Sequence, residues 1–296
     1  MKYALHSVSY AGFWRGQHFL TLKDFINKAA MLGFDGVEIM AKRPHASLLD
    51  MDKKARKKIR VLLDDNGIEC ACIAGYTDFT AGMDTGMLPS DELQILYVTE
   101  LAKLAAEWGC PLVRVFSGYE CAGVSYAQQW GRCVKSLREC ARRAAEHGVT
   151  LGIQNHHDIG VDTASMREML REINEPNCKA MLDAWAPAQF GENLSDSVKL
   201  LAGDIVYTTV ADYIRLPRFK YVPNLVSYER AQDRLQAVPM GEGFIDYTTF
   251  FNALKASGYN GYIAYEMCSE IRGGGSEDNL DRYARRFLDF IRNKKL

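Results

Sequence analysis

The stretch Ala30-Met31-Leu32-Gly33-Phe34-Asp35-Gly36-Val37-Glu38 contains the pattern from which the fold follows. A segment of helical hydrophobic period ends at Gly33, and a short apolar run begins at Gly36 and reaches a carboxylate at Glu38. Glycine accepts the left-handed backbone conformation that terminates a helix, so Gly33 is a physical stop signal. The stretch therefore predicts a helix, a tight connection and a buried strand, in that order.

The same order of elements repeats along the whole chain. Helix-stop glycines recur in Asn66-Gly67-Ile68, Trp108-Gly109-Cys110, His147-Gly148-Val149 and Ser257-Gly258-Tyr259. Strand-length apolar runs occupy residues 3–8, 36–40, 69–73, 112–116, 150–155, 179–183, 205–210 and 262–266. Amphipathic segments of helical period occupy residues 22–32, 52–66, 92–108, 126–147, 165–173, 194–202, 247–257 and 279–293.

Eight strand–helix units predict an α/β protein in which parallel strands, joined by right-handed crossovers, close into a single (β/α)8 TIM barrel spanning residues 1–296. An open doubly wound sheet is the structural alternative. Such a sheet normally has fewer strands and carries a G-x-G-x-x-G phosphate-binding turn after the first one, which this chain lacks.

One segment, residues 212–243, does not follow the repeat. It is far longer than the roughly two to six residues of an ordinary βα loop, and we expect it to be irregular. We interpret it as an excursion over the barrel mouth after the seventh strand, either a lid or an interface arm. A plain surface insertion is the alternative.

Composition narrows the classes of partner. The chain has 36 Lys+Arg and 37 Asp+Glu, a net charge of −1, so no global field attracts it to nucleic acid or an anionic membrane. The basic run at residues 53–60 is expected to be a solvated helix face. No apolar run reaches the roughly 18 residues of a membrane span, and the first residues are too polar for a signal peptide. The eight cysteines form no C-x-x-C pair, which favours a reducing, cytoplasmic location.

Polar residues gather where the predicted strands end. In a TIM barrel these ends meet at one face, where the chemistry lies. The residues are His6, Glu38, Arg114, Gln154, His156, Asp183, Thr209 and Glu266, with Trp185 directly after the sixth strand. Each has a structural explanation alone, such as a Glu38–Arg114 ion pair or an Asp183 helix cap. Together they would bury a large polar load without structural benefit, which favours a functional site.

At these residues the chain resembles the xylose isomerase-like family of TIM barrels, the sugar isomerase/epimerase superfamily, over essentially its whole length. The resemblance is carried by residues 30–38, 113–118, 154–156, 181–183, 240–246 and 258–266. It implies a divalent ion (manganese, magnesium or cobalt) held by glutamate, aspartate, histidine and glutamate, and no organic cofactor. Asp183 and Glu266 match the second and fourth ligands. Gln154 and Thr209 stand at the first and third, where carboxylate and imidazole are usual, so any metal would rest on Asp183, Glu266 and Gln154, with His156 or His6 completing the shell.

The resemblance implies an isomerase or epimerase that abstracts a proton next to the carbonyl of a keto-sugar or polyol. Glu266 or His156 would be the base and Asp183 a metal ligand or orienting group. The substrate would be held by His6, Glu38, Arg114, Gln154, Trp185, Thr209 and Arg272, the last beside a glycine run that lets backbone approach a ligand.

Three alternatives remain. The first is a lyase of the same family, such as an inosose dehydratase or a C-glycoside deglycosidase subunit acting on a 3-keto sugar, because one-sided proton removal suits elimination. The second is a non-catalytic sugar-binding barrel with a decayed metal site. The third, an AP endonuclease, is disfavoured because a trinuclear zinc cluster needs many His ligands and the chain has six His. The resemblance to this family also implies that the protein forms a homo-oligomer.

Overall fold

Eight parallel strands form a closed barrel in the computed structural model, which describes residues 1–293. The strands are β1 (Lys2–His6), β2 (Gly36–Met40), β3 (Glu69–Ala74), β4 (Leu112–Val115), β5 (Thr150–Gln154), β6 (Cys178–Met181), β7 (Ile205–Val210) and β10 (Tyr262–Tyr265). β1 pairs with both β2 and β10, so the sheet has no free edge. The predicted (β/α)8 barrel is confirmed, and the open sheet is excluded.

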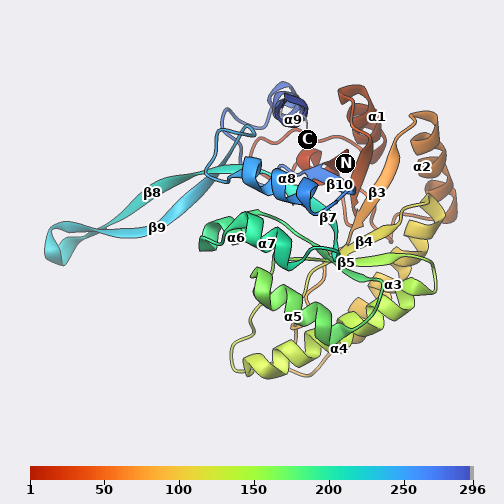
Figure 1. The fold of residues 1–296 in the computed structure, drawn as a ribbon, viewed down its shortest axis with the longest axis horizontal. Helices are drawn as coiled ribbons and strands as arrows, with labels where there is room; N and C mark the ends of the chain where they lie inside the picture. Colours follow the sequence, from red (N-terminus) through yellow and green to blue (C-terminus); the bar gives the residue numbers. More distant parts are fainter. Residues whose placement is uncertain (294–296) are drawn as a thin grey trace.

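Helices surround the barrel (Figure 1). The main ones are α1 (Leu22–Leu32), α2 (Lys53–Asp65), α3 (Ser90–Trp108), α4 (Tyr126–Ala145), α5 (Thr163–Ile173), α7 (Leu194–Leu200), α8 (Tyr247–Ala256) and α9 (Glu277–Asn293). The predicted helices are confirmed to within two residues at each end. Gly33 and Gly109 cap α1 and α3 with φ angles of 86° and 67°, as a left-handed stop requires. Three short helices, α6 (Trp185–Phe190), η1 (Ser7–Tyr10) and η2 (Pro223–Leu225), were not predicted.

The inside of the barrel is plugged by its own cluster of apolar side chains. The cluster comprises Ala4, Ala71, Cys72, Leu112, Met181, Tyr207 and Ala264, all from barrel strands and all buried. Gly152 on β5 makes room for this plug, because a Cβ there would lie 2.7 Å from the Met181 side chain. The polar residues at the ends of the strands therefore stand above a packed, dry layer and not over an open channel.

The segment after β7 is an ordered hairpin. Strands β8 (Asp212–Val222) and β9 (Ser227–Val238) pair antiparallel along their whole length and extend far from the barrel (Figure 1). The expectation of an irregular loop was wrong. Pro217 has no N–H for the ladder, and the register shifts between Leu216 and Arg218, so no clean alternation shows in the sequence. We call residues 212–238 the arm.

The base of the arm is fixed by Asp212. Its carboxylate accepts hydrogen bonds of 2.9 Å from the backbone N–H groups of Gly241 and Gly243. A Cβ at Gly243 would fall 1.9 Å from Asp212 Oδ1, so only glycine fits there. The returning chain is thereby held against the start of β8, next to the barrel mouth.

The structure also bears on the cysteines and on the search for a membrane-spanning helix. All eight cysteines are free, and six of them are buried among apolar side chains, as small hydrophobes usually are. Within residues 1–293, no helix combines the length and apolar character needed to cross a bilayer.

Candidate active site

A small cavity of about 170 Å³ opens at the carboxyl-terminal mouth of the barrel. The residues that line it are His156, Asp183, Trp185, Val210, Ala211, Tyr213, Leu235, Glu266, Cys268 and Ser269. The predicted catalytic residues Glu266, His156 and Asp183 thus face one cavity, together with Trp185. Tyr213 and Leu235 come from the arm, so the arm forms part of the cavity wall.

One side of the mouth is a cluster of ionisable groups around the charged Arg114, which we call the charged half: His6, Glu38, Arg114 and Glu266. Arg114 Nη1 lies 3.4 Å from Glu38 Oε1 and 3.9 Å from Glu266 Oε1. Glu38 and Arg114 are almost completely buried, whereas the Glu266 side chain is 13% exposed toward the cavity. The predicted Glu38–Arg114 ion pair is present, and the same guanidinium also forms an ion pair with Glu266.

Burial dominates the protonation of this half. It raises the pKa of the Glu38 carboxyl above its ordinary value, and the nearby Arg114 only partly opposes the shift. Burial likewise raises the pKa of Glu266, again against the effect of Arg114. Burial alone would lower the pKa of Arg114, but Tyr76, Glu38 and Glu266 raise it, so the guanidinium stays charged. Neither carboxylate oxygen of Glu38 has a hydrogen-bond partner among the described residues.

His6 is neutral and has a defined tautomer. Burial, followed by the charge of Arg114, lowers its pKa well below the ordinary value. Its Nδ1 accepts a hydrogen bond of 3.0 Å from the Val8 backbone N–H, so the proton of the neutral ring is on Nε2. Nε2 lies 3.4 Å from Glu38 Oε1 and 3.7 Å from Glu266 Oε1. Nε2 also lies 3.3 Å from Arg114 Nη1, so the ring is in contact with each of the other three groups of this half.

The opposite side of the mouth is held by neutral hydrogen bonds, and we call Gln154, Asp183 and Thr209 the amide half. Gln154 Nε2 donates to Thr209 Oγ1 at 2.7 Å and to Asp183 Oδ2 at 3.2 Å. The other Asp183 oxygen accepts from the Trp185 backbone N–H at 2.9 Å, at the start of α6. Asn155 bonds the Asp183 backbone on both sides, at 2.7 and 3.0 Å. Both oxygens of Asp183 are thus engaged.

Burial shifts the pKa values of two side chains in the cavity wall, Asp183 and His156. Burial raises the pKa of Asp183 to about 7, although the Trp185 N–H opposes the shift. Burial, and then the charge of Arg114, lowers the pKa of His156 to about 4, so its ring is neutral at physiological pH. The cavity therefore combines a carboxyl group, that of Asp183, whose pKa lies near neutrality with an imidazole that stays uncharged.

Not every predicted site residue joins this group. Arg272 lies away from the cavity lining, its side chain is 49% exposed, and its Nη1 lies 3.5 Å from Glu242 Oε2. Sequence reasoning missed Tyr213 and Cys268, whose Oη and Sγ lie 3.4 Å apart in the cavity wall. The position of Cys268, two residues after Glu266 at the end of a predicted strand, could have indicated that it lies near the site. Nothing in the sequence indicates this for Tyr213, because its place in the cavity wall depends on the course of the arm.

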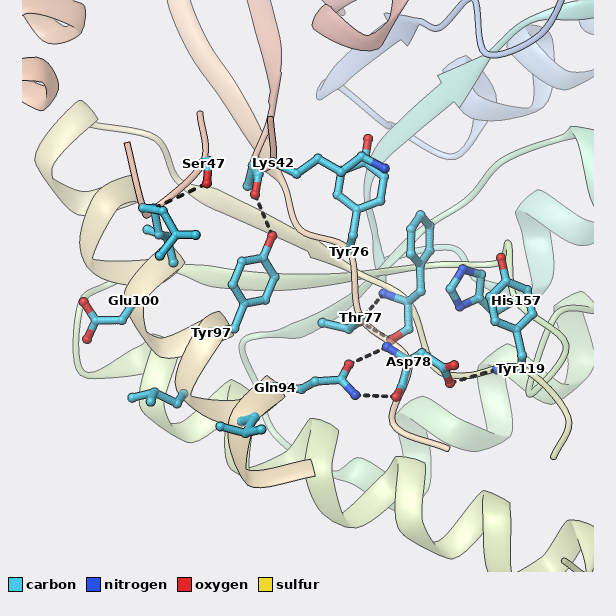
Figure 2. A pocket seen from close by; sticks show the side chains of 16 residues that line it. Lys42, Ser47, Tyr76, Thr77, Asp78, Gln94, Tyr97, Glu100, Tyr119 and His157 are labelled. Carbon is cyan, nitrogen blue, oxygen red and sulfur yellow. Dashed lines mark hydrogen bonds between the residues drawn. The ribbon is translucent and has the colours of Figure 1, made fainter. Parts of the chain in front are cut away.

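A larger groove of about 840 Å³ lies beside the mouth, over the ends of β2 and β3 and against α3 (Figure 2). Its walls are mostly apolar or aromatic, and the Gln94 carboxamide ties down the Asp78 backbone within it. Tyr76 and Phe116 separate the groove from the charged half, with ring centroids 4.9 and 4.6 Å from the Arg114 guanidinium carbon. The groove contains none of the three buried carboxylates of the mouth, so the chemistry belongs to the smaller cavity.

The residues present do not fit the divalent ion implied by the resemblance. Across residues 1–293 no three His, Cys, Asp or Glu side chains are grouped to hold a metal. The Gln154 amide turns its NH₂ group toward Asp183 and Thr209, so a donor faces the space between the ligand positions. A neutral carboxamide and a hydroxyl are also weak ligands for a transition metal.

Comparison with known proteins agrees with this architecture. Fructoselysine 3-epimerase of Escherichia coli O157:H7 is 23% identical over 285 residues, covering 94% of each chain. Inosose dehydratase of Lacticaseibacillus casei is 22% identical over 271 residues, covering 83% of this chain and 82% of that protein. The crystal structure of D-psicose 3-epimerase from Clostridium cellulolyticum H10, with D-tagatose, superposes with a TM-score of 0.75 at 18% identity, covering 99% of each chain.

The family description "xylose isomerase-like TIM barrel" matches residues 26–294. This match spans nearly all of the barrel, from within α1 to the end of α9. Related proteins include sugar epimerases and dehydratases. The chain therefore belongs to the xylose isomerase-like TIM-barrel family.

Proposed function

We propose that the protein is a carbohydrate-active enzyme that removes a proton from the carbon next to the carbonyl of a keto-sugar or polyol, giving isomerisation or epimerisation. The observation that carries the proposal is the convergence of Asp183, Glu266 and His156 on one cavity at the barrel mouth. A general base works best with a pKa near the operating pH. Burial raises the pKa of both carboxyl groups toward that range.

The catalytic roles we assign depend on which side chains already accept hydrogen bonds and which are open to the cavity. Both oxygens of Asp183 already accept hydrogen bonds, so its role is to orient substrate hydroxyl groups. Glu266 is partly open to the cavity, and it is the base that takes the carbon-bound proton. The neutral His156 ring can accept or relay a hydroxyl proton. The Trp185 ring, whose centroid lies 5.8 Å from that of His156, offers an apolar face for the sugar.

A lyase is the second candidate, and one observation favours it. Across the mouth from Glu266, the position of a second base is held by Gln154, whose amide cannot take a proton. Proton removal is then one-sided. In an elimination, the electron pair of the broken C–H bond forms the new double bond while the neighbouring hydroxyl leaves as water after gaining a proton. Elimination needs no second base on the opposite face.

Solvent-hydrogen exchange tests the proposal. Keto-sugars and keto-inositols are incubated with the enzyme in D₂O, and NMR follows the proton next to the carbonyl. Deuterium incorporation with inversion indicates an epimerase, a shifted carbonyl an isomerase, and loss of water with a new double bond a lyase. Saturable sugar binding without exchange of any C–H proton would instead establish the non-catalytic binding barrel.

We also propose that the arm joins copies of this chain into a homo-oligomer. A two-stranded hairpin alone is marginally stable in water, so the distal arm gains from a partner surface. Its tip exposes apolar side chains, with Phe219 62%, Leu225 65% and Tyr228 67% accessible. A tip of this kind is a typical contact between subunits and a poor free surface.

A further inference from the structure

We infer that Arg114, and not a bound divalent cation, supplies the positive charge at this barrel mouth, so that the site works without a resident metal. The catalytic part of this inference rests on the proposed function, whereas the part concerning metal binding stands by itself. Two observations carry it: the orientation of Gln154, and the place of Arg114 among the carboxylates.

The amide half offers a cation little to bind. Gln154 Nε2 points between Asp183 Oδ2 and Thr209 Oγ1, at 3.2 and 2.7 Å. Turning the amide over would set its carbonyl oxygen against a carboxylate oxygen, which is unfavourable. The Gln154 Oε1 atom has no hydrogen-bond partner among the described residues, and it is a single neutral oxygen. With Thr209 hydrogen-bonded to the same amide, only Asp183 and Glu266 remain as anionic ligands.

The charged half already contains a cation. Arg114 Nη1 lies 3.9 Å from Glu266 Oε1. A metal ion ligated by that oxygen at about 2.0–2.2 Å would lie within about 6 Å of the guanidinium, where two positive charges repel each other in a buried site. Arg114 cannot swing away, because it is 1% exposed and held between the rings of Tyr76 and Phe116. Its charge is permanent, since a guanidinium does not deprotonate in proteins.

Arg114 is accordingly a positioning residue. It does not line the cavity, so it acts on the substrate through Glu266. It favours the ionised, basic form of that carboxylate and places a fixed positive charge near the oxyanion that forms when the carbon loses its proton. In a metal-dependent relative, a bound ion would supply that charge.

Titration with Mn²⁺, followed by the electron paramagnetic resonance signal of the free ion, tests the metal-binding part. The wild-type protein is expected to leave the ion free up to about millimolar concentration. The matched variant Q154E/T209H restores the carboxylate and imidazole positions and is expected to bind Mn²⁺ at least about tenfold more tightly. Stoichiometric binding by the wild type at about 10 µM, abolished by D183N, would overturn the inference.

The pH dependence of kcat/KM tests the role of Arg114. R114M, combined with E38Q so that Glu38 is not left buried without its cation, is expected to move the acidic limb of the profile, which reports ionisation of Glu266, to higher pH, while R114K/E38Q keeps it in place. An unchanged profile in R114M/E38Q would refute the role of Arg114. If no sugar is turned over and the Mn²⁺ result holds, the proposed function fails while the metal-free site stands.

Discussion

The two halves of the barrel mouth hold their buried carboxyl groups in different ways. The charged half sets Glu38 and Glu266 against one guanidinium at 3.4 and 3.9 Å. The amide half holds Asp183 with neutral donors, Gln154 and the Trp185 backbone N–H. Both halves rest on the same dry layer of the barrel. Under the proposed function, this difference predicts that the carbon-bound proton is taken on the Glu266 side of the substrate.

The largest expected effect is loss of the base. Glu266→Gln preserves size but cannot take a proton, so the rate of C–H exchange should fall by about 10²–10⁴-fold. Deuterium incorporation in D₂O measures it. Glu270→Gln is the matched control, since Glu270 is half exposed and pairs with Arg234 on the arm. If E266Q keeps the wild-type rate, the base lies elsewhere and the division between the halves is not catalytic.

The second prediction compares how much each half of the mouth contributes to the free energy of unfolding. Arg114→Met leaves buried Glu38 without a cation and should lower the free energy of unfolding by about 3–5 kcal/mol. Gln154→Leu removes neutral hydrogen bonds on the amide half and should cost about 1–3 kcal/mol. Urea unfolding measures both. R114M/E38Q should recover much of the loss, because it removes the stranded carboxylate. Equal losses in the two single variants would show that the halves do not differ in this way.

A further effect on stability concerns pH. Because burial raises the pKa of Asp183 from 3.8 to about 7, the folded protein holds a proton that the unfolded chain has lost. This contribution to stability is fully present below about pH 4 and is lost as pH rises through about 7. Urea unfolding of wild type and Asp183→Asn between pH 4 and 8 should therefore show wild type losing stability relative to the variant. A constant difference across that range would contradict the raised pKa.

The smallest catalytic effect is expected at the arm. Replacing residues 219–230 by an Asn-Gly turn joins Arg218 to Ala231, which are paired in the ladder, and removes the apolar tip. The base of the arm, with Tyr213 and Leu235, stays in the cavity wall. Light scattering should show a smaller assembly, with C–H exchange changed by less than about threefold, since no cavity residue is altered. An unchanged assembly would mean that subunits meet elsewhere.

The barrel was predictable because its signals are local. Gly33, Gly67 and Gly109 mark helix stops through backbone conformation alone, and each has a positive φ angle. The arm was not predictable, because Pro217 and exposed side chains on both faces hide the period-two pattern. The short helix α6 was missed because it has only six residues, one of them Pro187.

The candidate site was predictable in its members and not in its contacts. Strand ends brought Glu38, Asp183 and Glu266 to one rim, as barrel topology requires. That Arg114 contacts both glutamates, and that the Gln154 amide faces Asp183, depends on side-chain rotamers set by tertiary packing. Arg272 followed a glycine run and was expected at the substrate, but its side chain pairs with Glu242 outside the cavity.

The arm also links two places that are far apart. Its base is clamped by Asp212 and supplies Tyr213 and Leu235 to the cavity, while its tip reaches well beyond the barrel (Figure 1). One two-stranded element thus runs from the cavity wall to a tip well beyond the barrel. If binding at the tip and binding in the cavity are coupled through this element, each changes the binding free energy of the other by the same amount.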